Sequence, residues 1–306
     1  MIEQSFSMTV SDGTVLEAKL NQTDRKHVVG LIHIFHGMAE HFHRYNRLVT
    51  ALNEAGYDVL RHHHRGHGIH IDETTRGHID SFKQAATDAY EIYQTLSSKY
   101  AHVPYIVLGH SMGSLIARRY IEQYSEVLDG LILTGTPQYP LWMARPARRL
   151  LDLIIIMTGK STLLPWLNQI VYHSFNKKIK PHRTSNDWLD TNPEHVDRFE
   201  NDPYTGFLVS NQLIYETLDT MIETSAARAL ERIDHNIPIL LMSGEEDPVS
   251  NYGKGVKHLY REYIRAGFND ITVQLYPNKR HEILFDDSDT ITWQHLFEWL
   301  KAQQHK

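Results

Sequence analysis

The sequence predicts an α/β protein whose core is a mostly parallel, doubly wound sheet with an inserted helical cap. Two observations support this prediction. Short β-rich apolar segments alternate with longer segments of helical periodicity, which is the pattern of parallel βαβ units. That alternation stops after Thr136, gives way to helical stretches as far as about Arg232, and then resumes. We therefore expect a core of residues 1–136 and 233–306, interrupted by a cap of residues 137–232.

The elements of the first half follow in chain order. Ser5–Leu20 has the period-two alternation of strands around the turn sequence Ser11-Asp12-Gly13, so it predicts a β-hairpin. The other strands expected here are short apolar runs, namely Val28–Phe35, Tyr57–Arg61, Tyr105–Leu108 and Leu131–Leu133. The expected helices have apolar residues at helical spacing, namely Tyr45–Ala55 (ending at Gly56), Ser81–Tyr100 and Ser114–Tyr124.

The same alternation returns after the expected cap. The strands predicted there are Ile239–Met242 and Ile271–Tyr276. A helix is expected at Lys254–Ala266, between these two strands, and a closing helix at Thr290–Gln303. Strands separated by helices of this length pair in parallel, so we expect these two to extend the same sheet.

Composition fits one large globular unit of 306 residues. Hydrophobic residues at 41% and charged residues at 22% exclude disordered and fibrous proteins. The 31 Lys and Arg against 37 Asp and Glu leave a net charge of −6, which argues against a nucleic-acid partner, because such proteins concentrate basic residues. The absence of cysteine excludes disulfides, a thiol nucleophile and every Cys-ligated metal site.

The location of the protein in the cell is inferred from two patterns that the sequence lacks. Residues 1–10 lack the basic start and apolar run of a secretory signal. The most apolar stretch, Leu150–Met157, includes Asp152 and is too short to cross a bilayer. We therefore expect a cytoplasmic protein.

The sharpest motif is Gly109-His110-Ser111-Met112-Gly113, a G-x-S-x-G between a predicted strand and a predicted helix. A sharp strand-to-helix turn needs small flanking residues and exposes the central serine hydroxyl. The Met112 amide, at the helix start, points toward any negative oxygen nearby. We interpret Ser111 as a nucleophile, with Gly109, His110 and Gly113 forming the elbow around it.

A serine nucleophile needs a base that an acid holds in place, and in this arrangement the acid precedes the histidine. The strand Ile239–Met242 leads into three carboxylates. We assign Asp247 as the acid because Pro248 fixes the turn that follows it. Glu245 and Glu246 are the alternatives.

The base is expected in the loop after the last strand, where His281 lies. The rival His258 falls in the middle of a predicted helix, from which the active edge of the sheet is hard to reach. We therefore assign His281 as the base.

A second backbone donor to the oxyanion is expected in the loop that follows Val28–Phe35, where enzymes of this type carry a His-Gly sequence. The sequence there is His36-Gly37-Met38-Ala39-Glu40-His41. Gly37 lets the backbone turn so that the Met38 amide faces the site and pairs with the Met112 amide.

These motifs together resemble the monoacylglycerol lipase and lysophospholipase branch of the α/β-hydrolases, which is also grouped with serine aminopeptidase-like hydrolases. The resemblance spans nearly the whole chain and rests on segments 36–41, 44–45, 65–68 and 109–113, and, in the cap, 187–193, 196–197 and 201–203. It implies the α/β-hydrolase fold and a cofactor-free serine hydrolase acting on a small-molecule acyl ester or lipid, such as a monoacylglycerol or lysophospholipid.

The resemblance also implies roles for the loop after the first core strand. Glu40 and His41 match the family and are expected to brace the oxyanion loop, beside His36 and Gly37. One position departs from the family pattern. His63 stands where relatives carry Asp, two residues before the Arg of Arg65-Gly66-His67-Gly68.

Five histidines of one loop suggest a metal cluster, namely His62, His63, His64, His67 and His70. Side chains of adjacent residues on an extended chain point to opposite faces, so three consecutive histidines cannot all bind one ion. Gly66 and Gly68 argue against the helical turn that would bring the last two together. We therefore expect no functional metal here, and only incidental metal affinity.

A basic cluster of Arg145, Arg148 and Arg149 precedes the apolar run Leu150–Met157. Such a segment is typical of a cap helix packed over a site, which is the interpretation we favour. Peripheral membrane contact through the cap is the alternative. Either suits a substrate with an acyl chain.

Two other functions stay open from the sequence. One is an aminopeptidase-like amidase on the same triad, which would need an acidic pocket for the substrate amine. The other is a non-catalytic binding protein, which the complete set of expected catalytic positions disfavours.

Overall fold

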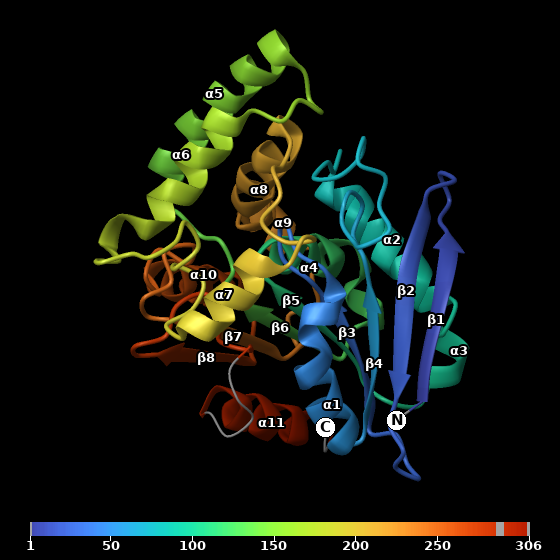
Figure 1. The fold of residues 1–306 in the computed structure, drawn as a ribbon. Helices are drawn as coiled ribbons and strands as arrows, with labels where there is room; N and C mark the ends of the chain where they lie inside the picture. The colour runs from blue at the N-terminus through green and yellow to red at the C-terminus, as the bar shows by residue number, and fades with distance from the viewer. Residues whose placement is uncertain (1, 286–290, 305–306) are drawn as a thin grey trace.

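The computed structural model describes residues 2–285 and 291–304. An eight-stranded sheet runs through the molecule, with helices on both of its faces (Figure 1). The strands are β1 (Ile2–Thr9), β2 (Val15–Gln22), β3 (Gly30–Phe35), β4 (Tyr57–His62), β5 (Tyr105–His110), β6 (Gly130–Thr134), β7 (Ile239–Gly244) and β8 (Ile271–Tyr276). The predicted α/β class with a mostly parallel sheet is confirmed.

Strand order across the sheet is β1-β2-β4-β3-β5-β6-β7-β8. The predicted hairpin is present as β1 and β2, which pair antiparallel, and β2 also pairs antiparallel with β4. All other neighbouring strands pair in parallel. The carboxyl ends of β3 to β8 therefore lie along one edge of the sheet, where open α/β sheets place their binding sites.

Strands β3 to β7 are buried on both faces, and successive side chains enter two different cores. In β3, for example, Leu31 and Phe35 belong to one apolar cluster, whereas Ile32 and Ile34 belong to the other. This alternation is what a period-two strand covered on both sides requires.

Helices from opposite ends of the chain cover each face of the sheet. Residues of α1 (Asn46–Glu54) and α11 (Ile291–Gln303) fill one core. Residues of α2 (Phe82–Gln94), α4 (Met112–Tyr124) and α10 (Lys254–Ala266) fill the other. Short turns of 3-10 helix, η1 (Phe42–Tyr45) and η2 (Ser125–Val127), precede α1 and follow α4.

One predicted helix is divided in the structure. The single helix predicted over residues 81–100 is two, α2 and α3 (Ser97–Tyr100), and the Ser81 hydroxyl caps the first by accepting from two backbone amides. The break follows Thr95, whose hydroxyl bonds the Ile92 carbonyl at 2.7 Å. Neither glycine nor proline marks this break, so apolar periodicity alone missed it. The predicted start of the last helix, Thr290, lies outside the described residues.

Five α-helices lie between β6 and β7. They are α5 (Leu141–Thr158), α6 (Pro165–Phe175), α7 (Pro193–Asn201), α8 (Asn211–Thr224) and α9 (Ala227–Leu230), with a 3-10 turn, η3 (Asn176–Lys178), after α6. Residues 137–232 are all described, and none of them forms a strand. In Figure 1, α5 and α6 extend away from the sheet. Among the helices described, none combines the length and apolarity needed to span a membrane.

Candidate active site

The sheet brings the predicted site residues together from four strand ends. Ser111 follows β5, Asp247 follows β7, His281 follows β8, and the loop containing Met38 follows β3. Ser111, His281, Met38 and Met112 all line one cavity of about 300 Å³. Residues predicted from separate motifs therefore meet in one place.

Ser111 occupies a strained turn between β5 and α4. Its backbone has φ 52° and ψ −120°, outside the regions that side-chain-bearing residues favour. Its amide donates to the Thr134 carbonyl at 2.9 Å, which anchors the turn to β6. A Cβ atom added to Gly113 would lie 2.1 Å from the Phe35 carbonyl oxygen, so this position must be glycine.

His281 is held by a buried carboxylate. Its Nδ1 lies 3.0 Å from Asp247 Oδ1, and that carboxylate also accepts from the Val249 amide at 2.9 Å and the Ser243 hydroxyl at 3.2 Å. The fixed acceptor places the proton of the neutral imidazole on Nδ1 and leaves Nε2 as the basic nitrogen. Among the described residues, His281 Nε2 has no hydrogen-bond partner.

The two groups of this pair stabilise each other's charged forms. Burial acts to lower the pKa of His281, but the charge and hydrogen bond of Asp247 outweigh it and hold that pKa above the ordinary 6.5. Burial acts to raise the pKa of Asp247, whereas the charge and hydrogen bond of His281 hold it below 3.8. A buried Asp–His pair of this kind is suited to receiving a proton at Nε2.

The rival acid and base residues lie elsewhere. Glu245 and Glu246 are exposed, and the structure gives neither of them a contact with His281. His258 lies on α10 with its side chain 43% exposed, 4.0 Å from Glu262. None of these three lines the cavity.

The loop after β3 lies directly beside the nucleophile. A Cβ atom added to Gly37 would lie 3.3 Å from Ser111 Cβ. Met112 begins α4 and Met38 lines the same cavity, so both predicted oxyanion donors border the space in front of Ser111. Tyr172 of α6 donates to the Met38 sulfur at 3.7 Å, which links this loop to the helical segment above it.

His67, to which no role in the site was assigned from the sequence, fixes this loop. His67 Nδ1 lies 2.9 Å from the Arg65 carbonyl, so that nitrogen carries the proton. His67 Nε2 then accepts from the Ala39 amide at 3.1 Å. Ala39 has φ 52°, an unfavourable conformation that this bond helps to maintain. The motif at residues 65–68 was visible in the sequence, but the contact of His67 with Ala39 was not.

Glu40 forms a buried anchor of the loop. Its carboxylate accepts from the Gly37 amide, the Arg44 guanidinium and the Tyr45 hydroxyl. Burial acts to raise the pKa of Glu40, but the Arg44 guanidinium, the neighbouring imidazoles and the Gly37 amide lower it to about 2. Arg44 also bonds both oxygens of Glu282, the residue that follows the predicted base.

His36, His41 and His110 are buried around the same loops. His36 Nδ1 lies 2.8 Å from the Gly37 carbonyl, and His36 Nε2 accepts from the His64 amide at 3.1 Å. His41 bonds Asp202 at 2.9 Å. His110 packs against the His281 ring at 4.8 Å, and burial lowers its pKa to about 3, so it stays neutral.

The rest of the cavity wall is apolar and comes mainly from the segment between β6 and β7. The aromatic and aliphatic side chains of that segment that line it are Pro137, Tyr139, Ile170, Val171, Tyr172, Phe175, Trp188, Leu189, Phe199, Val209, Ile214 and Leu218. Trp188 packs against the His281 ring at 5.0 Å. The amide of Glu282 donates to the Leu189 carbonyl at 2.7 Å, which joins this wall to the loop of the base.

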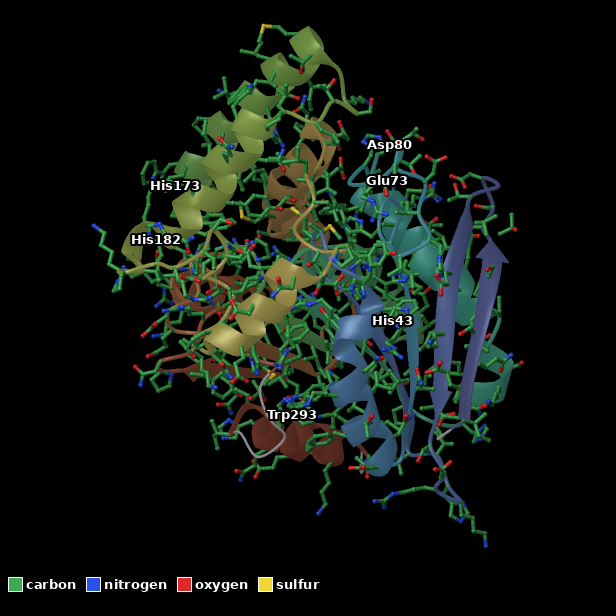
Figure 2. The ribbon with its side chains drawn as sticks, viewed as in Figure 1. His43, Glu73, Asp80, His173, His182 and Trp293 are labelled. Atoms are coloured by element: carbon green, nitrogen blue, oxygen red, sulfur yellow. The ribbon has the colours of Figure 1, made fainter. Side chains whose placement is uncertain are left out.

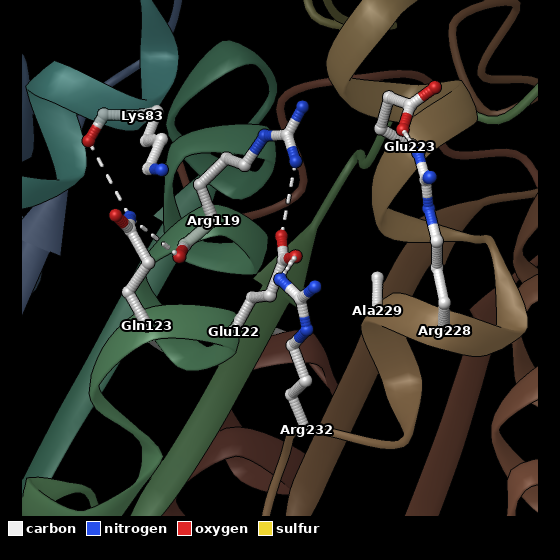
Figure 3. Close-up of a pocket in the computed structure, with 8 residues that line it drawn as sticks. All are labelled: Lys83, Arg119, Glu122, Gln123, Glu223, Arg228, Ala229 and Arg232. Atoms are coloured by element: carbon white, nitrogen blue, oxygen red, sulfur yellow. Dashed lines mark hydrogen bonds and ion pairs between the residues drawn. The ribbon is translucent and has the colours of Figure 1, made fainter.

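A second cavity, of about 320 Å³, contains charged groups that pair with one another (Figure 3). Arg119 and Arg232 both contact Glu122, at 3.1 and 3.4 Å, and Arg228 pairs with Glu223. None of its lining residues is a candidate nucleophile, so this cavity offers no comparable chemistry.

Comparison with known proteins agrees with the arrangement described above. The model of the Hydrolase_4 family, described as serine aminopeptidase S33, matches residues 26–288. "Probable lysophospholipase L2" of Haemophilus influenzae is 25% identical over 263 residues, covering 84% of this chain and 78% of that protein. Monoglyceride lipase of Mus musculus is 26% identical over 254 residues, covering 82% and 75%. A thermostable carboxyl esterase from Bacillus coagulans, solved with glycerol, matches with a TM-score of 0.89 and 29% identity over 99% of both chains.

Proposed function

The chain belongs to the serine aminopeptidase S33 family of α/β-hydrolases, and we propose that it hydrolyses acyl esters such as monoacylglycerols or lysophospholipids through an acyl-enzyme on Ser111. Family membership confirms the resemblance drawn from the sequence motifs. The observation that supports the ester substrate best is the cavity itself, which has Ser111 and His281 at one side and mostly apolar side chains around the rest.

In the proposed mechanism Ser111 attacks the ester carbonyl carbon while His281 Nε2 takes its proton. Asp247 keeps the imidazole oriented and stabilises the imidazolium that forms. The Met38 and Met112 amides donate to the oxyanion of the tetrahedral intermediate. Collapse of that intermediate releases the alcohol, which takes the proton from His281. Water then attacks the acyl-enzyme with His281 again as the base, and the fatty acid leaves.

Charge in the cavity favours an ester over a peptide amine. An aminopeptidase needs an unpaired carboxylate to bind the positive amino group of its substrate. The two glutamates that line this cavity, Glu40 and Glu282, are both bonded to Arg44. Neither is therefore available to a substrate amine, and the apolar wall suits an acyl chain.

We further propose that residues 137–232 form a cap over the site and that the outer surface of α5 and α6 contacts a membrane. This surface exposes large apolar side chains, namely Trp142, Met143, Leu150, Leu153, Ile156, Met157, Trp166 and Ile170. Ile156 is 79% exposed and Trp142 is 76% exposed. Arg145 and Arg149 are exposed on the same helix, whereas Arg148 pairs with Asp219 at 2.7 Å. Apolar side chains with adjacent free cations are typical of an anionic lipid interface.

The first experiment is hydrolysis of an ester series from acetyl to long acyl chains, including monoacylglycerols, with Ser111→Ala as the inactive variant. We expect rates that peak at medium or long chains and vanish in the variant, which should also fail to react with a serine-directed phosphonate. A preference for acetyl esters would move the substrate to small soluble esters. Hydrolysis of amides alone would favour the amidase, and absence of both activity and labelling would favour a binding protein.

The membrane proposal has its own test. Sedimentation with vesicles containing anionic lipid should recover the protein, and Ile156→Glu with Trp142→Glu should abolish the binding while leaving hydrolysis of a soluble ester intact. Equal recovery of wild type and variant would contradict the proposal.

A further inference from the structure

Three side chains from separate parts of the chain converge beside β2, away from the proposed catalytic residues. Glu17 belongs to β2, His43 to the 3-10 turn η1, and His63 to the loop after β4. Each offers one potential metal ligand atom, and these atoms lie within 4.8 Å of one another. His43 is labelled in Figure 2, just before the start of α1. No motif in the sequence connects these three positions.

We propose that Glu17, His43 and His63 bind a divalent transition-metal ion, of which Zn²⁺ is the best match. Two imidazole nitrogens and one carboxylate oxygen are ligands that suit zinc, whereas calcium and magnesium favour all-oxygen sites. Water would supply the fourth position of a tetrahedral centre. The proposal is independent of the ester hydrolase function.

The strongest support is a buried imidazole whose nitrogens are both unsatisfied. The His63 side chain is only 4% exposed, and neither of its ring nitrogens has a hydrogen-bond partner in the described part of the chain. His43 Nε2 is likewise buried with no partner among those residues. Leaving a buried polar atom unsatisfied is costly. A shared metal ion would satisfy both imidazoles at once.

The ligand distances are near those that a metal needs. His63 Nε2 lies 3.9 Å from Glu17 Oε2, too far for a hydrogen bond. Zinc bonds of about 2.0–2.2 Å place the ligand atoms of a tetrahedral site about 3.4 Å apart. Glu17 is 28% exposed, so its side chain has freedom to close the remaining distance.

Neighbouring residues hold the His63 side chain in place. The His63 amide donates to the Glu17 carbonyl at 3.0 Å, so these two residues are fixed side by side. Phe42 stacks on the His63 ring with centroids 3.8 Å apart, and the backbone of Gly68 approaches the same ring closely. Packing therefore fixes the orientation of this imidazole before any ion binds, which lowers the entropic cost of binding.

An ion has a route to this site. Glu17 and His63 line a cavity of about 650 Å³, which also contains His64, His67 and the exposed His70. The nearby Lys19 ammonium is paired with Glu3 at 2.7 Å, so it does not compete for Glu17. The argument against three consecutive histidines still holds, because only one member of the His62–His64 run takes part.

The test is zinc binding to the full chain, free of any histidine tag and treated with chelator. Isothermal titration should give one Zn²⁺ per chain, and Co²⁺ should give the visible absorption of a tetrahedral centre. Thermal unfolding should shift upward by about 5 °C at a hundredfold excess of zinc over the dissociation constant. Glu17→Gln, His43→Gln and His63→Gln should each weaken binding at least about tenfold.

His258→Gln is the matched control, because His258 lies 4.0 Å from Glu262 on the exposed face of α10 and offers an ordinary surface His–Glu pair. Its affinity should equal that of the wild type. Glu17→Gln alters a partly exposed side chain whose carboxylate accepts no hydrogen bond from the described residues, so it tests the site even if His63→Gln fails to fold. No stoichiometric binding, or binding that survives Glu17→Gln and His43→Gln, would overturn the proposal.

Discussion

Arg44 donates to both carboxylate oxygens of Glu282, at 2.8 and 2.9 Å, across 238 positions of the sequence. The same guanidinium bonds Glu40, whose carboxylate holds the Gly37 amide. One buried cation therefore ties the proposed oxyanion loop to the loop of the proposed base. The relative position of the two loops depends on a group that contacts neither the nucleophile nor the acid.

Arg44→Met should destabilise the protein by about 3–5 kcal/mol, because it leaves Glu40 and Glu282 buried without their counter-charge. Urea unfolding monitored by circular dichroism measures the loss. Arg265→Met is the control, since Arg265 pairs with Glu262 at 2.6 Å but is 70% exposed. That change should cost less than about 1 kcal/mol. Equal losses in the two variants would contradict a special role for Arg44.

Hydrolysis should rise with pH as His281 loses its proton, with an apparent pKa above the ordinary 6.5, because Asp247 raises the pKa of that imidazole. Asp247→Asn should lower kcat by about 10⁴-fold and move this acid limb to lower pH. The pH profile of kcat/KM for a soluble ester measures both effects. Glu246→Gln serves as the control, and an unchanged profile in Asp247→Asn would exclude Asp247 as the acid.

His67→Leu should reduce kcat about tenfold with little change in KM, because the Ala39 amide loses its acceptor and the oxyanion loop loses a fixed position. Steady-state kinetics on a soluble ester separates the two constants. His67→Gln, which retains an acceptor, should recover part of the rate. His70→Leu controls for loss of a histidine from the same segment, since His70 is exposed. A rise in KM alone would indicate a substrate contact instead.

Leu218→Trp should shift the preferred substrate toward shorter acyl chains, because Leu218 lines the apolar part of the cavity. The ratio of kcat/KM for long and short esters should fall, while the rate with an acetyl ester is retained. Leu153→Trp changes an outward-facing residue of α5, 57% exposed, and should leave the ratio unchanged. A proportional loss for all esters would place the acyl chain elsewhere.

Stability should fall as the pH drops below about 6.5, because several histidines are buried in neutral form. Burial lowers the pKa of His62 to about 3 and of His67 to about 4, and holds the pKa values of His33, His36 and His64 well below 6.5. The unfolded chain takes up protons below 6.5 that the folded chain does not. Each such group therefore removes about 1.4 kcal/mol per pH unit until its folded pKa is reached.

Urea unfolding at about pH 7.5 and about pH 5.5 tests this prediction. His281 acts in the opposite sense, because its raised pKa adds stability that is present at low pH and lost as pH rises through it. This one histidine with a raised pKa is outweighed by the five histidines whose pKa values are lowered. A free energy of unfolding that stays constant between the two pH values would contradict the neutral, buried state of these histidines.

The sequence predicted what lies close along the chain or follows from strand order. Ser111 was visible because its elbow is a continuous motif, and the sheet order then placed Asp247 and His281 at neighbouring strand ends. The bonds of Arg44 to Glu282 and of His67 to Ala39 join distant segments, and no periodicity encodes which side chains will meet. The convergence of Glu17, His43 and His63 was hidden for the same reason.

The segment that lines most of the cavity leaves the sheet after β6 and returns to it at β7, and these two strands are immediate neighbours. The segment is thus attached at two adjacent points, while Ser111, Asp247 and His281 sit on strand ends outside it. We expect that a homologous segment of different length or composition can be exchanged here without disturbing the register of the sheet. The residues that select the substrate could then change in evolution independently of the residues that carry out the reaction.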